Sequence, residues 1–154
     1  PGLGTVTGNT DFTADVVDTR TTRADPLLAP FAAGIAEGVP LVMLSLSTYS
    51  AIDAENLAAF SPVVIQSMLR GDLGFAGVVI SDDLGIAAAV RTVPPAERAL
   101  RFLRAGGDVV LTVDPTAARV MAQAVATDPA LTPLVDAAAL RVLRAKERFG
   151  LLAC

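Results

Sequence analysis

Two adjacent carboxylates, Asp82 and Asp83, come just after the apolar run 78–80, from which Ser81 separates them. A continuous β-branched run without polar alternation is typical of a strand that is buried on both faces, as in a parallel sheet covered by helices. Parallel α/β folds place their chemistry where such strands end. Asp82 is therefore our main candidate for a catalytic residue. We expect Asp83 to hold the turn by accepting hydrogen bonds from backbone N–H groups.

Cleavage of a glycosidic bond is a reaction for which a pair of carboxylates is the standard device. One carboxylate attacks the anomeric carbon or stabilises its positive charge, and the other gives a proton to the leaving oxygen. Asp82 and Asp83 are poorly placed to act as this pair, because successive side chains leave a strand on opposite faces. The partner of Asp82 is expected from another loop, and Asp11 in the opening loop is the available acid.

Polar residues also follow the other predicted strands. Ser45 follows residues 41–44, Thr112 lies near the end of the segment 108–113, and Asp114 follows that segment. In a barrel of parallel strands these ends meet at one face. A structural role is the simpler interpretation of each: Ser45 and Thr112 as hydrogen-bonding loop residues, and Asp114 as a helix cap.

Short strands alternate with helices along the chain, which predicts right-handed βαβ units and a parallel sheet. Three strands cannot close a barrel of eight. We therefore expect either a small open α/β sheet or the C-terminal part of a (β/α)8 barrel, and the short strands and apolar composition favour the partial barrel. The predicted strands cover residues 41–44, 77–81 and 108–113, and the predicted helices cover residues 30–37, 61–71, 94–105, 114–126 and 136–150.

Residues 1–154 form one partial domain in this interpretation, with residues 1–30 as an active-site loop and residues 45–56 as a second loop. Ser61 and Asp136 are expected to cap the helices that follow them. We expect Arg70 to interact with the dipole at the C-terminus of its helix. Three further arginines are expected to face solvent: Arg98, Arg101 and Arg104.

The composition limits the classes of protein to consider. The chain has 154 residues, 53% of them hydrophobic and 18% charged, and a net charge of −4. Without a basic cluster, nucleic acid is not expected as a partner, and no apolar run approaches the roughly 18 residues of a membrane helix. The chain has no His, which excludes Ser-His-Asp and Cys-His machinery and His metal ligands within it, and its one Cys, Cys154, cannot form an internal disulfide. The high apolar content predicts buried strands, or a surface that another piece of chain covers.

The segment 69–84 resembles the nucleophile segment of glycoside hydrolase family 3, with its closest match in the bacterial β-N-acetylhexosaminidases. The matching residues are Leu69-Arg70 and then Leu73-Gly74-Phe75-Ala76-Gly77-Val78-Val79-Ile80-Ser81-Asp82-Asp83-Leu84. Pro30-Phe31, Val42-Met43, Phe60-Ser61 and the ending 141–151 are similar as well, so the resemblance covers nearly the whole chain.

This resemblance implies a (β/α)8 barrel and an enzyme that removes terminal β-linked N-acetylglucosamine, for example from cell-wall fragments, with retention of configuration. Asp82 would be the nucleophile that forms the glycosyl-enzyme. Pro1-Gly2-Leu3-Gly4 is similar to the end of the family's Lys-His-Phe-Pro-Gly-His-Gly loop, so we expect about half of the barrel upstream, as an N-terminal segment or a separate chain. No metal or organic cofactor is implied, and the partner is a carbohydrate substrate.

The chain departs from the family pattern at the acid/base. The hexosaminidases commonly use an Asp-Ser-His triplet, and the matching residues here are Asn9-Thr10-Asp11. Asp11 would then take the position of the His and serve as the acid/base, which a carboxylic acid can do. The other expected substrate contacts are Asn9, Met43, Ser45, Ser81 and Asp83.

Two alternatives stay open beside the hexosaminidase. One is another reaction within the family, as a β-glucosidase or a phosphorolytic relative. The other is a non-catalytic, sugar-binding half-barrel, because the acid/base differs from the family pattern. We expect the 154-residue piece alone to show little activity, with open sheet edges and much exposed apolar surface.

Overall fold

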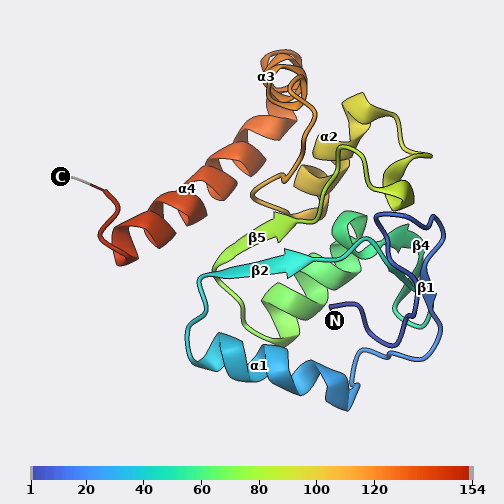
Figure 1. The fold of residues 1–154 in the computed structure, drawn as a ribbon. Helices are drawn as coiled ribbons and strands as arrows, with labels where there is room; N and C mark the ends of the chain where they lie inside the picture. Colours follow the sequence, from blue (N-terminus) through green and yellow to red (C-terminus); the bar gives the residue numbers. More distant parts are fainter. Residues whose placement is uncertain (1, 153–154) are drawn as a thin grey trace.

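The structure, a computed structural model, describes residues 2–152 of the chain, so Pro1 and Cys154 lie outside the described residues. At its centre, strands β2 (Leu41–Leu44) and β5 (Val78–Ser81) pair in parallel. The helix that precedes β5, η3 (Val63–Asp72), has the wider hydrogen-bond pattern of a π-helix. Figure 1 shows β2 and β5 side by side, with η3 and α1 (Ala29–Ala36) on the same side of the pair. The βαβ unit that the alternation predicts is thus confirmed.

Glycine lies at or just beyond the C-terminal ends of two helices. Gly38 follows α1 with a φ of 78°, and Gly106 ends α2 with a φ of 105°, a left-handed conformation that favours glycine. α3 starts later than predicted, because the Asp114 carboxylate accepts hydrogen bonds from Thr116 and holds a turn ahead of the helix. The remaining helical elements are α2 (Pro95–Ala105), α3 (Ala117–Thr127), α4 (Thr132–Arg148) and the 3₁₀ turns η1 (Pro26–Leu28), η2 (Ala58–Phe60), η4 (Ala88–Val90) and η5 (Pro129–Leu131).

The predicted cap of the last helix is wrong. Asp136 lies inside α4, which starts at Thr132 with a proline in its first turn. The capping side chain is Asp128, which accepts a hydrogen bond of 3.1 Å from the N–H of Ala130 and so starts the 3₁₀ turn that leads into α4. Ser61, in contrast, accepts a hydrogen bond from the N–H of Val64 at the start of η3, and its capping role is confirmed.

The third predicted strand, residues 108–113, is not a regular strand. It lies beside β5 and forms a single parallel bridge, between Ile80 and Val109. The N–H of Leu111 donates to the side-chain oxygen of Ser81, at 2.9 Å, rather than to a backbone carbonyl. This side-chain contact replaces a bond of the backbone ladder, and regular pairing ends there.

A second, small sheet was not predicted from the sequence. β1 (Val17–Asp18) pairs in parallel with β3 (Thr48–Tyr49), which pairs antiparallel with β4 (Asp53–Leu57). These strands lie in the stretches 1–30 and 45–56, which were predicted as loops. β1 and β3 have two residues each, which is too short for a pattern of alternation to be recognised. The small sheet fixes the segment before α1 against the segment after β2.

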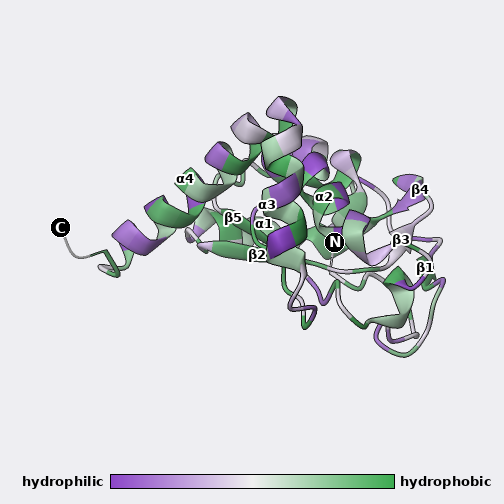
Figure 2. Ribbon diagram, turned by 90° about the horizontal axis from the view of Figure 1, so that it is seen from above, coloured by the Kyte–Doolittle hydropathy of each residue, from purple (hydrophilic) through white to green (hydrophobic). Residues whose placement is uncertain are grey.

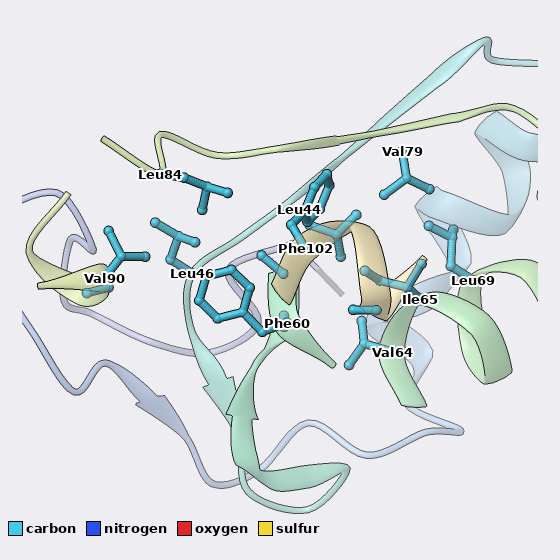
Figure 3. Packing of buried hydrophobic residues seen from close by; sticks show 14 of the residues in the cluster. Leu44, Leu46, Phe60, Val64, Ile65, Leu69, Val79, Leu84, Val90 and Phe102 are labelled. Carbon is cyan, nitrogen blue, oxygen red and sulfur yellow. The ribbon is translucent and has the colours of Figure 1, made fainter. Parts of the chain in front are cut away.

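The core lies between the β2–β5 pair and the helices η3 and α2. Figure 3 shows Leu44 and Val79 from the strands together with Ile65 from η3 and Phe102 from α2. Arg98 belongs to this buried region, at 8% exposure, and its predicted solvent-facing position is wrong. Its guanidinium donates to the carbonyl oxygens of Val93, Leu84 and Gly85, which supply the partners that a buried charge requires. Arg101 and Arg104 are exposed, as predicted.

One face of β2 is open. Leu41 and Met43 are 44% and 50% exposed, whereas Leu44 is buried, so the predicted burial of this strand holds for one face only. Leu111 and Val113, in the segment beside β5, are exposed as well. Figure 2 shows the hydrophobic residues along β2 and β5. The described residues, 2–152, therefore leave an apolar strand surface uncovered.

A buried carboxylate joins three elements at the amino-terminal end of β5. The fully buried side chain of Asp108 forms ion pairs of 2.8 Å with Arg70 of η3 and Arg141 of α4, and accepts a hydrogen bond from the N–H of Val79. Arg70 also donates to the carbonyl oxygens of Phe75, Gly77 and Gly106. Its predicted interaction with the dipole of its own helix is therefore replaced by contacts beyond that helix.

Candidate active site

A pocket of about 550 Å³ lies at the carboxyl ends of β2 and β5. The opening segment forms one wall, and the ends of the two strands form the other. Five predicted site residues line this pocket: Asn9, Asp11, Met43, Ser45 and Asp82. The two candidate catalytic carboxylates thus come together from segments that are far apart in the sequence.

Asp82 is held by the sheet that precedes it. Its N–H donates to the carbonyl of Leu44 at 3.1 Å, which continues the β2–β5 pairing past the end of β5. Its Oδ1 accepts a hydrogen bond of 2.8 Å from the N–H of Asp83, and the side chain is half-buried. The backbone is thus fixed while the carboxylate lines the pocket, which is the arrangement expected of a nucleophile on a strand end.

Ser81 and Asp83 have structural contacts, and neither lines the pocket. The Asp83 carboxylate accepts hydrogen bonds from the N–H groups of Gly85 and Ile86, so its predicted role in holding the turn is confirmed. Ser81 is fully buried and binds the backbone of Leu111. Direct contact of either residue with a substrate stays a prediction.

The loop that carries Asn9 and Asp11 is attached to the segment that follows Asp82. The carbonyl oxygens of Thr10 and Asp11 accept hydrogen bonds of 3.0 Å from the N–H groups of Ala89 and Ala88. The side-chain oxygen of Asn9 accepts a hydrogen bond from the N–H of Asp11. Within residues 2–152, no side chain or N–H group donates to the Asp11 carboxylate, which leaves it available to a ligand in the pocket.

Asp18, which the sequence analysis missed, anchors the other end of this loop. Its buried carboxylate accepts hydrogen bonds from the N–H and hydroxyl of Thr5, from the N–H of Arg20, and from the N–H and hydroxyl of Thr21. The signal was present, because an Asp followed closely by Thr is typical of a side chain that accepts from N–H groups two and three residues on.

The pKa of Asp18 predicts how stability depends on pH. Burial alone raises this pKa, but the hydrogen bonds from Thr21, Thr5 and Arg20 outweigh it and hold the pKa well below its usual range. Because the folded-state pKa is lowered, the carboxylate stabilises the fold above its unfolded-state pKa of about 3.9, and this contribution is lost as the pH falls further.

We expect the difference in unfolding free energy between the wild type and Asp18→Asn to be constant above about pH 5 and to shrink below about pH 4. Urea unfolding of both proteins across this range is the measurement. A difference that stays constant through the acid range would contradict the assignment.

A larger cavity, of about 700 Å³, lies among α2, α3 and α4 and has a mostly apolar lining. Thr112 and Asp114 line this cavity and not the pocket that contains Asp82. Thr112 accepts a hydrogen bond from the N–H of Asp114, so its predicted role as a hydrogen-bonding loop residue is confirmed. The predicted helix cap at Asp114 is wrong, because its carboxylate holds a turn with Thr116 and α3 begins only at Ala117, without a side-chain cap. None of the other candidate site residues lines this larger cavity.

Residues 2–152 contain no group of three or more His, Cys, Asp or Glu side chains placed to hold a metal ion. Within the same range, no helix is both long and apolar enough to cross a membrane.

Residues 1–145 match the family model described as the N-terminal domain of glycosyl hydrolase family 3. The chain belongs to glycosyl hydrolase family 3. The family that segment 69–84 indicates is thereby confirmed. The match runs through both walls of the pocket.

Solved structures of the family have the same fold. A β-N-acetylhexosaminidase from Beutenbergia cavernae DSM 12333 is 44% identical and superposes with a TM-score of 0.90, over 95% of this chain and 45% of that one. A family 3 β-N-acetylglucosaminidase from Paenibacillus sp. str. FPU-7 is 28% identical, with a TM-score of 0.82, over 97% of this chain and 30% of that one. The α/β architecture is that of part of a TIM-type barrel, as predicted.

Curated relatives are also β-hexosaminidases by name. The protein of Stenotrophomonas maltophilia (strain K279a) is 44% identical over 117 residues, which are 75% of this chain and 34% of the relative. That of Xylella fastidiosa (strain M12) is 43% identical over 118 residues, with the same coverage. The chain therefore spans about a third of the length of the curated relatives that it matches.

Proposed function

We propose that this chain supplies the catalytic end of a retaining glycoside hydrolase that removes terminal β-linked N-acetylglucosamine from glycans such as cell-wall fragments. The observation that carries the proposal is that Asp82 and Asp11 line one pocket at the carboxyl ends of parallel strands. The family relationship supports it, because structural and curated relatives at 44% identity are named as β-N-acetylhexosaminidase and β-hexosaminidase.

The two carboxylates have different roles in this reaction. Asp82, ionised, attacks the anomeric carbon, and the glycosidic bond breaks as Asp11 gives its proton to the leaving oxygen. Water then attacks the glycosyl-enzyme while Asp11 takes a proton from it, and Asp82 is released. Two inversions at the same carbon restore the original configuration.

Polar groups around the two carboxylates orient the sugar. Asn9 and Ser45 present an amide and a hydroxyl to the pocket, and Met43 adds an apolar wall. Ser81 and Asp83 act through the backbone in this proposal, because they hold the turn that carries Asp82.

We propose that an N-terminal segment of the same protein, continuous with this chain or present as a separate chain, completes the barrel. The exposed face of β2 at Leu41 and Met43 supports this, because an apolar strand surface of this kind requires a cover. The segment beside β5 exposes Leu111 and Val113 in the same way. Sugar contacts from the missing strands would complete the pocket.

Covalent labelling tests the proposed function. The completed barrel is treated with a fluorinated N-acetylglucosaminyl donor that has a good leaving group, which makes formation of the glycosyl-enzyme faster than its hydrolysis. Peptide mass spectrometry is expected to find one added sugar on Asp82. A sugar on another residue would overturn the nucleophile assignment. Neither label nor turnover of a chromogenic N-acetylglucosaminide would favour the non-catalytic, sugar-binding alternative.

A further inference from the structure

We infer that Asp18 is a positioning residue for the proposed glycosidase reaction, because it fixes the loop that brings Asp11 to Asp82. The inference rests on the proposed function and adds a residue outside the pocket to it. Asp18 belongs to β1 of the small sheet, and it does not border the pocket. Its influence on the reaction therefore has to pass through the loop.

Five hydrogen-bond donors converge on the Asp18 carboxylate. Oδ2 accepts from the N–H of Thr5 and from the hydroxyls of Thr5 and Thr21, while Oδ1 accepts from the N–H groups of Arg20 and Thr21. Only an ionised carboxylate can accept all five, since an amide has one acceptor oxygen and would turn its NH2 group toward donors. Asp18→Asn therefore removes one of the two acceptor oxygens, and with it the hydrogen bonds that this oxygen accepts, while it keeps the shape of the side chain.

The hydrogen bonds of Asp18 connect the opening segment to β1. Thr5 lies within the stretch 2–11 that forms one wall of the pocket, just before the part that carries Asn9 and Asp11, and Asp18 lies beyond the end of this stretch. The opening segment packs tightly against Asp18 and Tyr49 at Gly4, because a Cβ added at Gly4 would collide with the Asp18 carboxylate and with Tyr49. Tyr49 donates from its hydroxyl to the carbonyl of Gly2, and it also contacts the Ser45 hydroxyl. Asp18 thus closes the base of the loop against the end of β2.

The tip of the loop is attached to the segment after Asp82 by two backbone hydrogen bonds. The carbonyl oxygens of Thr10 and Asp11 accept from the backbone at Ala88 and Ala89, in the segment that follows Asp82. Thr10 is buried, whereas Phe12 is 81% exposed, so these backbone bonds hold the tip with little apolar packing. Because the tip of the loop is held only by these bonds, the position of Asp11 depends on the contacts of Asp18 at the base of the loop. A loosened base moves the acid/base away from the leaving oxygen and leaves Asp82 in place.

The test is a comparison of leaving groups in the completed barrel. Departure of a dinitrophenolate needs almost no proton, whereas departure of the second sugar of chitobiose depends on the acid. For Asp18→Asn, we expect the loss of kcat/KM on chitobiose to be at least about tenfold greater than the loss on the dinitrophenyl glycoside. The full contribution of a general acid is about 10²–10⁴-fold, so a misplaced acid can produce a difference of this size. The basic limb of the pH profile on chitobiose should move as well.

Asp53→Asn is the matched control. Asp53 is also a carboxylate that accepts several hydrogen bonds, from Ser61, Asn56 and the N–H of Glu55, but these tie β4 to the start of η3 and not to the loop. A loss for Asp53→Asn should be the same on both substrates. Equal losses on both substrates for Asp18→Asn, or no loss, would overturn the inference.

A second variant keeps the test decisive if Asp18→Asn does not fold. Thr5→Ala removes one hydroxyl donor from the base of the loop, and a smaller loss of the same kind is expected, again greater on chitobiose. Equal activity ratios for Thr5→Ala and the wild type would contradict the inference. Failure of the proposed function itself is recognised separately, because Asp82→Asn would then retain activity on both substrates.

Discussion

Replacing Asp82 by Asn is expected to lower kcat for hydrolysis of an aryl N-acetylglucosaminide by at least about 10⁴-fold, since removal of an enzyme nucleophile typically costs this much or more. The amide is neutral, so it neither attacks the anomeric carbon nor stabilises the charge that develops there. Its shape and its contact with the N–H of Asp83 are preserved, and substrate affinity should change little. Steady-state kinetics and calorimetric titration with a disaccharide measure the two effects.

Two companion variants make this prediction specific. Glu97→Gln removes an exposed carboxylate that pairs with Arg101 on α2, and it should leave kcat unchanged. Asp82→Gly opens space where the nucleophile stood, and azide should restore turnover by attacking from that side to give the α-glycosyl azide. Product of the β configuration, or an Asp82→Asn variant with undiminished kcat, would show that Asp82 is not the nucleophile.

Replacing Asp108 by Asn is expected to lower the free energy of unfolding by about 3–5 kcal/mol, the usual cost of breaking a buried ion pair from one side. The reason is the position of Asp108, whose side chain is fully buried and pairs with Arg70 and Arg141. Without the carboxylate, the partly buried guanidinium of Arg70 loses its counter-charge in a region that water reaches poorly. Urea unfolding monitored by circular dichroism gives the free energy.

An exposed ion pair is the control for Asp108. Asp72 pairs with Arg23 on the surface, and each side chain is about half exposed, so Asp72→Asn should leave the urea midpoint nearly unchanged. An Asp108→Asn variant as stable as Asp72→Asn would mean that the three-element junction adds nothing to stability. Because Asp108 lies at the other end of β5 from Asp82, activity at temperatures well below unfolding should persist.

The parts of the fold that the sequence predicts are those with a local signal. The β-branched run 78–80 predicts β5, and a glycine at position 106 is typical of a helix end, where it adopts the left-handed backbone that ends α2. Residues 108–113 do not form the predicted strand, because the Ser81 hydroxyl accepts the hydrogen bond from the N–H of Leu111 that a backbone carbonyl would accept in a regular sheet. Arg98 was placed in solvent because its spacing matches that of Arg101 and Arg104, and the carbonyl oxygens that it binds belong to the irregular segment 84–93 ahead of α2, which has no periodic pattern to reveal them.

In the candidate site, too, some features can be predicted from the sequence and others cannot. The position of Asp82 follows from the strand that ends before it, and the roles of Asp11 and Asn9 follow from the resemblance to the family. The meeting of these residues in one pocket depends on Asp18 and on the backbone at Ala88 and Ala89. Such contacts join segments distant in sequence and have no periodicity, so a pattern of hydrophobic and polar residues cannot reveal them.

The closed base of the opening loop has a consequence for the diversification of this fold. Residues 6–17 form an Ω-like loop whose ends are fixed by the contacts of Asp18 with Thr5. The entropic cost of closing a loop rises by only about 0.6 kcal/mol for each doubling of its length. Insertions and deletions between these fixed ends should therefore be tolerated by the barrel, while they change which groups face the leaving sugar. In laboratory evolution, the segment between Thr5 and Asp18 is therefore the part of the chain whose length can be randomised without moving its ends.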